Sequence, residues 1–188
     1  MHPNASQPHR RFAPIALAFV LFVAAVPALA QDDDDFSREG PYLGVYGIAA
    51  FENAGHTLPV DDTGGVGVQI GFRVVPKLAI EVMGDYLRLG GRNPWSLGTN
   101  VRLYVLPFFD VTLFDDRLQP FLIGTAGIQT GDLGDGKRPG GHLRGGLGAD
   151  FWVTSDLAVS AVVQYAGSGG AASKLQTLNT TLGVLWRY

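Results

Sequence analysis

The chain has 188 residues, which suits one domain of ordinary size, and it contains no cysteine, so disulfides, thiolate metal sites, cysteine nucleophiles and a lipid-modified N-terminal cysteine are excluded. Its 17 acidic residues outnumber its 14 basic ones, which argues against a nucleic-acid partner. Glycine is abundant, with 26 residues, and charged residues make up only 16%, a mixture that suits strands facing something other than water.

Residues 1–30 are predicted to be a secretory signal peptide that is cleaved on export. A basic start at 9–11 precedes the apolar run 15–26, and Ala28-Leu29-Ala30 follows as a small-residue cleavage site. A membrane anchor is the rival reading, but the run is shorter than the ~20 residues that a spanning helix needs. An acidic leader, 31–40, is expected to be solvated in the periplasm ahead of a mature domain at 41–188. No later stretch is long and apolar enough to span as a helix, so a mature protein in a membrane must cross it as strands.

From Tyr42 onward, segments of about ten residues alternate between apolar and polar positions, with Gly, Pro, Asp and Asn clusters between them. The segments 42–51 and 120–129 have no clear phase, because Gly, Ala and apolar residues occupy both faces. The expected strands are 42–51, 66–74, 78–86, 100–105, 120–129, 147–153, 157–165 and 176–188. Eight is an even number, as in bacterial outer-membrane barrels. The predicted fold is therefore all-β, an eight-stranded antiparallel up-and-down transmembrane β-barrel.

A secreted, lipocalin-like barrel also has eight strands, and residue placement distinguishes it from a membrane barrel. The lysines of the mature part, Lys77, Lys137 and Lys174, all fall in predicted turns or loops, whereas a water-facing sheet carries charge along its strands. Aromatic residues gather near the strand ends, as in the interfacial girdles of membrane barrels. One rim has Phe51, Tyr86 and Tyr165, and the other has Phe72, Phe151, Trp186 and Tyr188.

The connections alternate in length, as expected for short periplasmic turns and longer outer loops. Those at 75–77 and 154–156 are tight. The longer, polar ones are at 52–64, 89–97, 130–139 and 167–175. The connection at 108–118 is an exception, because it falls on the periplasmic side and yet is long, and extra strand residues within it would explain its length. The pattern favours a membrane barrel.

The chain resembles the small outer-membrane β-barrel family that includes the OmpA-like transmembrane domains. The matching residues are Tyr42-Leu43-Gly44, Gln119-Pro120-Phe121, Gly146-Leu147-Gly148-Ala149-Asp150 and the terminal Tyr188 with apolar residues at alternate positions before it. In that family the last strand resembles a signal read by the barrel-assembly machinery. The resemblance implies the same role here for Leu182, Val184, Trp186 and Tyr188.

Chemical motifs are few. Residues 131–137 match the glycine and lysine spacing of a phosphate-binding loop, but Arg138 stands where Ser or Thr would hold magnesium, and no strand-to-helix context is predicted. Asp132 and Asp135 lack the ligand spacing of an EF-hand. His56 and His142 have no adjacent Ser of the kind expected in a lipid A-modifying enzyme, so no catalytic, cofactor or metal site is predicted.

Six charged residues fall on the polar phase of the predicted strands, and we expect them inside the barrel: Arg73, Glu81, Asp85, Arg102, Asp150 and Arg187. An eight-stranded barrel is just wide enough for its side chains to fill it, so a sealed, self-neutralising interior is favoured over an ion-conducting path. Glu81 and Arg102 lie at similar depth and are predicted to pair, with Arg73 as a further partner of Glu81.

The sequence therefore favours a non-enzymatic protein of the bacterial outer membrane with a structural or surface-interaction role. A narrow pore and a lipid A-modifying enzyme are the alternatives. The expected partners are outer-membrane lipid and lipopolysaccharide, together with the assembly machinery during biogenesis. No surface ligand follows from the sequence.

Overall fold

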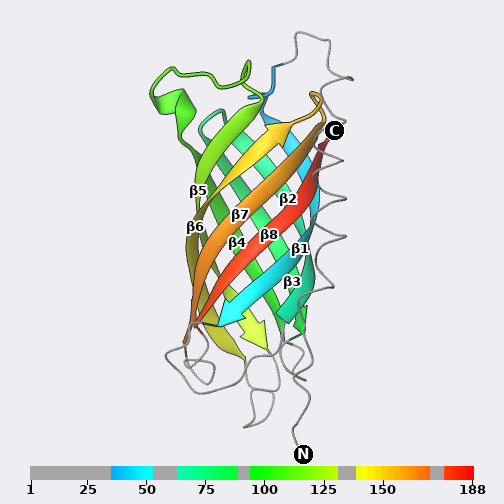
Figure 1. Cartoon of the computed structure of the whole chain (residues 1–188), viewed down its shortest axis with the longest axis vertical. Coiled ribbons are helices and arrows are strands. Elements are labelled where there is room, and N and C mark those ends of the chain that lie inside the picture. The colour runs from blue at the N-terminus through cyan, green and yellow to red at the C-terminus, as the bar shows by residue number, and fades with distance from the viewer. Residues whose placement is uncertain (1–34, 53–62, 89–93, 131–138, 170–175) are drawn as a thin grey trace, which may run out of the picture. The chain divides into compact units, whose positions relative to one another are not determined.

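The structure, a computed structural model, describes residues 35–52, 63–88, 94–130, 139–169 and 176–188. Eight strands pair in sequence order, and β8 returns to pair with β1, so the sheet closes into an antiparallel barrel (Figure 1). The strands are β1 (Gly40–Glu52), β2 (Thr63–Val75), β3 (Leu78–Arg88), β4 (Trp95–Tyr104), β5 (Leu118–Thr130), β6 (Gly140–Trp152), β7 (Leu157–Ser168) and β8 (Gln176–Arg187). The predicted fold class is confirmed. The predicted signal peptide, 1–30, lies outside the described residues.

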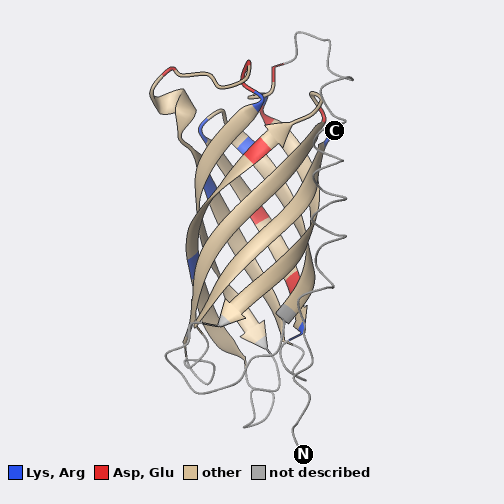
Figure 2. Cartoon of the chain, viewed as in Figure 1, with Lys and Arg blue, Asp and Glu red and all other residues tan. Residues whose placement is uncertain are grey.

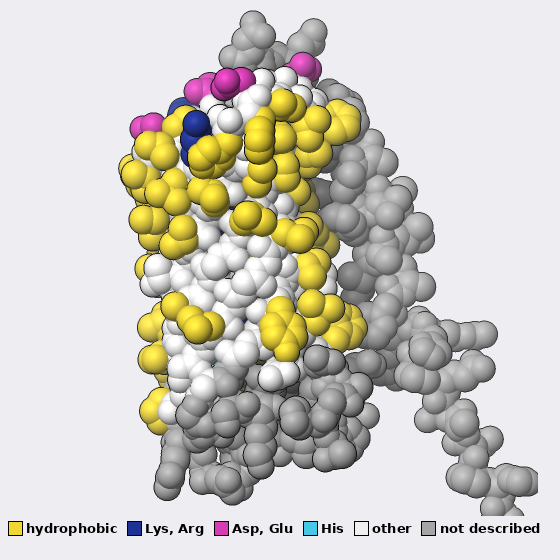
Figure 3. Space-filling model, turned by 90° about the vertical axis from the view of Figure 1, so that its left-hand side faces the viewer, with side chains coloured by type: hydrophobic (Ala, Val, Ile, Leu, Met, Phe, Trp, Pro, Cys, Tyr) yellow, Lys and Arg dark blue, Asp and Glu magenta, His cyan; other side chains and the backbone are white. Residues whose placement is uncertain are grey.

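Strict alternation along the strands creates the two faces of the barrel. In β3, Ile80, Val82 and Tyr86 are exposed on the outside, while Glu81 and Asp85 are buried inside. Figure 3 shows hydrophobic side chains over much of one outer face, and Figure 2 shows few charged positions along the strands. An apolar exterior around a polar interior is the arrangement expected of a barrel in lipid, where a sheet must also close on itself because hydrocarbon cannot hydrogen-bond an open edge.

The structure resolves the phase of the two ambiguous segments. In β1, Tyr42 and Ile48 are buried inside, and in β5, Phe121 and Ile123 are as well. The phase was hidden because inward positions of these strands carry aromatic and aliphatic residues. Tyr42 lies directly opposite Gly71 of β2, where a small residue leaves room for its ring. Large and small side chains thus complement each other across the β1–β2 pair, and the tyrosine ring covers the backbone that the glycine leaves open.

The two ends of the barrel differ in their connections. At one end, Pro76 and Lys77 join β2 to β3, and residues 153–156 join β6 to β7; we call this the tight-turn end. The C-terminus lies at the same end (Figure 1). The opposite end, with the connections 53–62, 89–94, 131–139 and 169–175, is the long-loop end. β4 begins at Trp95, so the predicted connection 89–97 is shorter than expected. Most of it, like the phosphate-loop match at 131–137, lies outside the described residues.

The exceptional connection at the tight-turn end is not additional strand. After Tyr104 the chain forms the 3₁₀ helix η2 (Leu106–Phe108) and then a turn, and only Leu118 of the predicted connection 108–118 joins β5. Asp110, Phe114, Asp115 and Asp116 have positive φ angles, which extended strands do not adopt. No helix in the described ranges is long and apolar enough to cross a membrane.

Aromatic side chains lie on the outer face near both ends. Phe51 and Tyr165 lie at one level near the long-loop end, since both are opposite Leu178 in the strand register. Trp186 and Tyr188 lie near the tight-turn end, with ring centroids 6.0 Å apart. The exposed aromatic residues of the strands and the C-terminus are Phe51, Phe72, Tyr86, Trp95, Tyr165, Trp186 and Tyr188. They form two bands around the barrel, as the sequence predicted, except that Phe151 of the second rim is half-buried and Trp95, opposite Tyr86, joins the first.

Candidate functional site: the charged interior

The strands bring the predicted interior charges together inside the barrel. The six are Arg73, Glu81, Asp85, Arg102, Asp150 and Arg187, and each is exposed by 4% or less. A seventh, Arg144 of β6, is also buried and faces inward. Four guanidinium groups therefore share the described interior with three carboxylates. They are arranged in three groups along the barrel axis.

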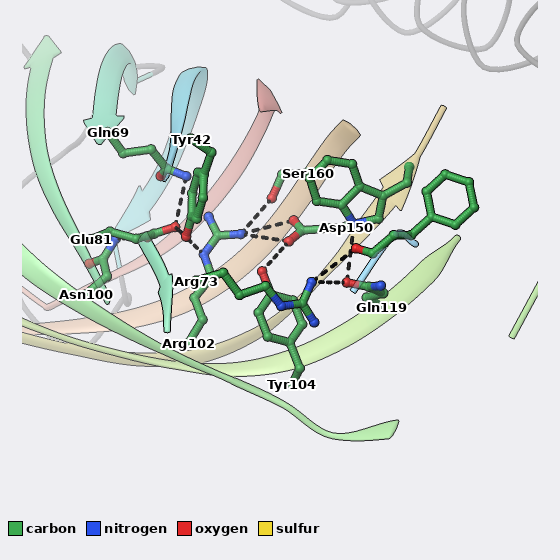
Figure 4. A network of polar contacts seen from close by, with 12 residues as sticks. Tyr42, Gln69, Arg73, Glu81, Asn100, Arg102, Tyr104, Gln119, Asp150 and Ser160 are labelled. Carbon is green, nitrogen blue, oxygen red and sulfur yellow. Dashed lines mark hydrogen bonds and ion pairs between the residues drawn. The ribbon is translucent and has the colours of Figure 1, made fainter. Parts of the chain in front are cut away.

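The central triad consists of Glu81, Arg102 and Asp150, from β3, β4 and β6 (Figure 4). Arg102 Nε lies 2.7 Å from Oε1 of Glu81, an ion contact without hydrogen-bond alignment. Its Nη1 donates to both carboxylate oxygens of Asp150, at 3.0 and 3.1 Å. Arg102 also lies over the Phe121 ring, 4.5 Å from its centroid. One cation therefore holds two buried carboxylates from opposite sides of the interior.

Neutral donors complete the coordination of Glu81. The Tyr42 hydroxyl donates to Oε1 at 2.6 Å, Gln69 Nε2 donates to the same oxygen at 3.1 Å, and Asn100 Nδ2 donates to Oε2 at 2.8 Å. Both oxygens of a fully buried carboxylate thus have partners, which offsets the cost of removing the charge from water. On the far side of the triad, the Tyr104 hydroxyl donates to Asp150 at 2.9 Å.

Towards the long-loop end, Asp85 pairs with Arg144 rather than with any of the predicted charges. Arg144 Nη1 lies 2.6 Å from Oδ2 of Asp85, and its Nη2 donates to Ser96 Oγ at 2.8 Å. The Ser96 hydroxyl donates in turn to Asp85, and the Tyr46 hydroxyl donates to the other carboxylate oxygen. Because Ser96 accepts from a guanidinium, its oxygen is a poor nucleophile.

At the tight-turn end, Arg73 and Arg187 have no carboxylate partner among the described residues. Arg73 does not contact Glu81 there; it donates to Gln119 Oε1 at 2.6 Å and to the carbonyl of Pro76. Both guanidiniums lie over aromatic rings, Arg73 4.0 Å from the Tyr104 centroid and Arg187 3.9 Å from the Trp152 centroid. The prediction that Arg73 is a further partner of Glu81 was therefore wrong, and at this end aromatic faces, an amide and carbonyls take the place of carboxylates.

Phe36 closes the tight-turn end. Its side chain is buried among the interior aromatics, and its carbonyl accepts from Arg73 at 3.3 Å and Arg187 at 3.2 Å. Arg117 lies over the Phe36 ring, 4.6 Å from its centroid. The described part of the leader is thus anchored in the barrel rather than wholly solvated. Beside it, the Ser37 hydroxyl donates to Asp35 and holds the pKa of that carboxyl below its ordinary value.

Sequence reasoning missed Arg144 and Phe36 for different reasons. Arg144 shares the inward phase of Asp150, six positions further along the same strand, so extending the alternation of β6 towards its start would have found it. Phe36 precedes the first strand and carries no periodic signal. Its position depends on the arginine pair, which comes from β2 and β8.

A cavity of about 20 Å³ lies in the interior, lined among others by Gln69, Asn100, Arg102 and Arg144. That is room for about one water molecule. No group of three metal-ligating side chains occurs in the described ranges. His142 faces inward near Arg144, and its ring nitrogens have no partner among the described residues; His56 lies outside them.

The predicted assembly signal lies on the outside of β8. Trp186 and Tyr188 are exposed, Leu182 is exposed to a smaller degree, and Val184 is half-buried. Tyr188 follows the end of the strand, while Arg187 beside it faces inward. These four side chains form an apolar row on the strand that closes the barrel against β1.

No protein-family model matches the chain, and no curated protein matches it. Its structure is similar to Neisserial surface protein A, at 16% identity over 79% of this chain and 97% of that protein, with a TM-score of 0.64. It is also similar to outer membrane protein H of P. aeruginosa, at 12% identity over 79% and 99%, with a TM-score of 0.53. Ail, the attachment invasion locus protein of Yersinia pestis, matches at 13% identity over 80% and 97%, with a TM-score of 0.52. The resemblance to small outer-membrane barrels is thus confirmed at the level of the fold.

Proposed function

We propose that this chain is a non-enzymatic protein of the bacterial outer membrane whose sealed barrel supports a structural or surface-interaction role. The observation that carries the proposal is the filled interior. Charged groups, aromatic rings and amides occupy the barrel along its axis, and the cavity in its interior is about 20 Å³. A packed core of this kind makes the barrel a rigid support for the loops at its ends.

The outer surface supports the proposed location. Exposed aliphatic side chains such as Val68 and Ile70 cover the strands between the two aromatic bands. Outer-membrane lipid and lipopolysaccharide are the partners that fit this surface. We place the tight-turn end in the periplasm and the long-loop end outside the cell, with cleavage of residues 1–30 during export.

Three features favour this role over a pore and over a lipid-modifying enzyme. Arg102 bridges Glu81 and Asp150 across the interior, so the charges are engaged with one another at the centre of any path. His142 faces the interior, whereas a residue that acts on lipid must reach the outer surface. Ser96 is engaged by Asp85 and Arg144.

Planar-bilayer recordings on the refolded chain test the sealed interior. The proposal predicts no channel steps above those of the empty bilayer. Reproducible, ion-selective steps would show that the interior conducts and would favour the pore.

Two experiments on cells test the rest of the proposal. Mass spectrometry of lipid A before and after loss of the gene is expected to show the same acyl pattern, and a changed pattern would favour the enzyme. Shortening a predicted outer loop, such as 131–138, is expected to reduce surface binding in an adherence assay without changing the amount of folded barrel. Unchanged adherence for every shortened loop would leave only the structural role.

A further inference from the structure

The connection between β4 and β5 displays a cluster of apolar side chains at the tight-turn end. Phe109 and Phe114 are each 70% exposed, and Phe108, Val111 and Leu113 are exposed as well. These five residues lie within one short loop, 105–117, where contiguous apolar exposure marks a contact surface.

The loop has a defined fold. Val111 N donates to the carbonyl of Leu106 at 3.4 Å, and Leu118 N donates to that of Leu113 at 3.2 Å. Phe114 has a φ of 53°, a left-handed conformation that is unfavourable for a bulky residue and persists only where the surrounding structure enforces it. The backbone thus holds these apolar side chains on display.

The base of the loop is fixed to the barrel. Arg117 Nη1 donates to the carbonyl of Val153 at 3.0 Å, and Trp152 N donates to the carbonyl of Arg117 at 2.8 Å. In Figure 1 the loop, in bright green, projects sideways beyond the barrel wall at the tight-turn end. The loop therefore lies outside the rim of the barrel, next to the outer surface that lipid would cover.

The apolar cluster continues the lipid-facing surface of the wall. Leu103 of β4 and Leu122 of β5 are exposed on the outer face just beside the loop. Figure 3 looks at this side and shows hydrophobic side chains gathered towards the tight-turn end, with acidic side chains at the extreme edge beyond them. A cation lies beside the cluster, since Lys77 Nζ is 4.7 Å from the centroid of the Phe108 ring.

We propose that loop 105–117 is a membrane-interface anchor, which inserts Phe108, Phe109 and Phe114 into the phospholipid leaflet at the tight-turn end. Aromatic side chains favour the boundary between headgroups and acyl chains, and a neighbouring lysine attracts headgroup phosphates. The acidic residues at the edge stay in water. This inference rests on the proposed membrane location.

Spin labelling tests the anchor on the whole chain, which contains no native cysteine. Single variants Phe109→Cys and Phe114→Cys are labelled with a nitroxide and reconstituted into phosphatidylethanolamine–phosphatidylglycerol vesicles. Collision rates are measured with oxygen, which concentrates in hydrocarbon, and with a water-soluble nickel complex. Leu122→Cys, on the outer wall, is the lipid control. Ser155→Cys, in the turn 153–156 at the same end, is the water control.

The anchor predicts an oxygen-to-nickel collision ratio at positions 109 and 114 that is several-fold above that at 155 and close to that at 122. Nickel access at 109 and 114 equal to that at 155, with position 122 still in lipid, would overturn the anchor and leave the membrane barrel standing. Nickel access at 122 as well would overturn the proposed location itself. Labels shielded from both reagents, with dipolar broadening between molecules, would assign the loop to contact with a second copy.

Discussion

Arg102 is the member of the central triad that contacts both of the others, Glu81 and Asp150. Glu81, by contrast, has three further donors in Tyr42, Gln69 and Asn100. Loss of the cation leaves two buried carboxylates facing each other. Loss of one carboxylate leaves the cation with its other partner.

Arg102→Met is therefore expected to destabilise the barrel more than Glu81→Gln. The first change leaves buried charge uncompensated and should cost about 3–5 kcal/mol. The second retains the Arg102–Asp150 contact and should cost about 2 kcal/mol, the value of a charge-assisted hydrogen bond. Urea unfolding of the refolded variants in lipid vesicles measures both. Equal costs would mean that Asp150 does not share the cation.

The double variant Glu81→Gln/Arg102→Met sharpens this test. If Glu81 and Arg102 formed an isolated pair, removing both would leave no uncompensated charge. Because Asp150 remains buried, the double variant should stay markedly less stable than wild type, and adding Asp150→Asn should recover part of the loss. No recovery in the triple variant would count against a three-member cluster.

Phe36 links the leader to the barrel, and Phe36→Ala should lower the free energy of unfolding by about 3 kcal/mol, the usual cost of removing a buried phenyl ring. The ring fills space beside Arg117, and its removal loosens the carbonyl that Arg73 and Arg187 share. Glu39→Ala, an exposed change in the same segment, is the control and should be nearly neutral. Equal stability of the two variants would show that the leader does not close the barrel.

At the scale of single residues, alternation and depth along the strands identified the Glu81–Arg102 pair and the inward charges other than Arg144, but not the partners of Asp85 and Asp150. Glu81 and Asp85 share one strand and one face, yet they bind different arginines, because Arg102 and Arg144 come from separate strands at different depths. Pairing across a barrel depends on side-chain reach through the interior. A local sequence pattern does not contain that information.

Among the strands, β1 and β2 pack through tyrosine–glycine pairs, and Gly71 tests this packing. A Cβ at Gly71 would lie within 2.4 Å of the Tyr42 ring, so Gly71→Ala must displace the ring whose hydroxyl binds Glu81. We expect a loss of about 1–3 kcal/mol by overpacking. Gly145→Ala is the matched control, since its Cβ meets nothing within 4 Å, and it should be neutral or slightly stabilising. The same urea experiment compares them, and equal effects would contradict the inward placement of Tyr42.

The last strand gives a prediction about assembly. Deleting Tyr188 removes an exposed ring beyond the end of β8, so the stability of refolded protein should change by no more than about 0.5 kcal/mol. Its level in the outer membrane should nevertheless fall, because the strand resembles the signal read by the assembly machinery. Quantitative blotting of membrane fractions beside refolding in detergent separates the two effects. Normal membrane levels would argue against an assembly role for Tyr188.

Strands and tight turns were largely predictable, because period-two patterning and the turn at Pro76-Lys77 are local signals. A long connection was predicted at 108–118, but its conformation was not. Several of its residues are apolar like those of a strand, and the positive φ angles that turn the chain occur at three aspartates and Phe114 rather than at glycine. The pattern therefore left open whether the segment held additional strand residues.

For the molecule as a whole, every strand has a neighbour on each side, and closure occurs along eleven residue pairs from Tyr42–Arg187 to Glu52–Thr177. The outer face is apolar and the inner face is charged and packed. These properties belong together, since a sheet with no free edge can lie in hydrocarbon while its polar groups are satisfied within. The alternation of apolar and polar residues that specifies the barrel carries no information about what its surface binds, so binding specificity could not be predicted.

The central claim, a closed barrel in the outer membrane, is tested most directly by gel mobility of the protein taken from outer-membrane fractions. A closed sheet without a free edge should resist dodecyl sulfate at room temperature and unfold on boiling. We expect two apparent masses, one for the unboiled and one for the boiled sample, with the protein in the membrane fraction. Identical mobility in both samples, together with recovery of the protein in the soluble periplasmic fraction, would contradict the account.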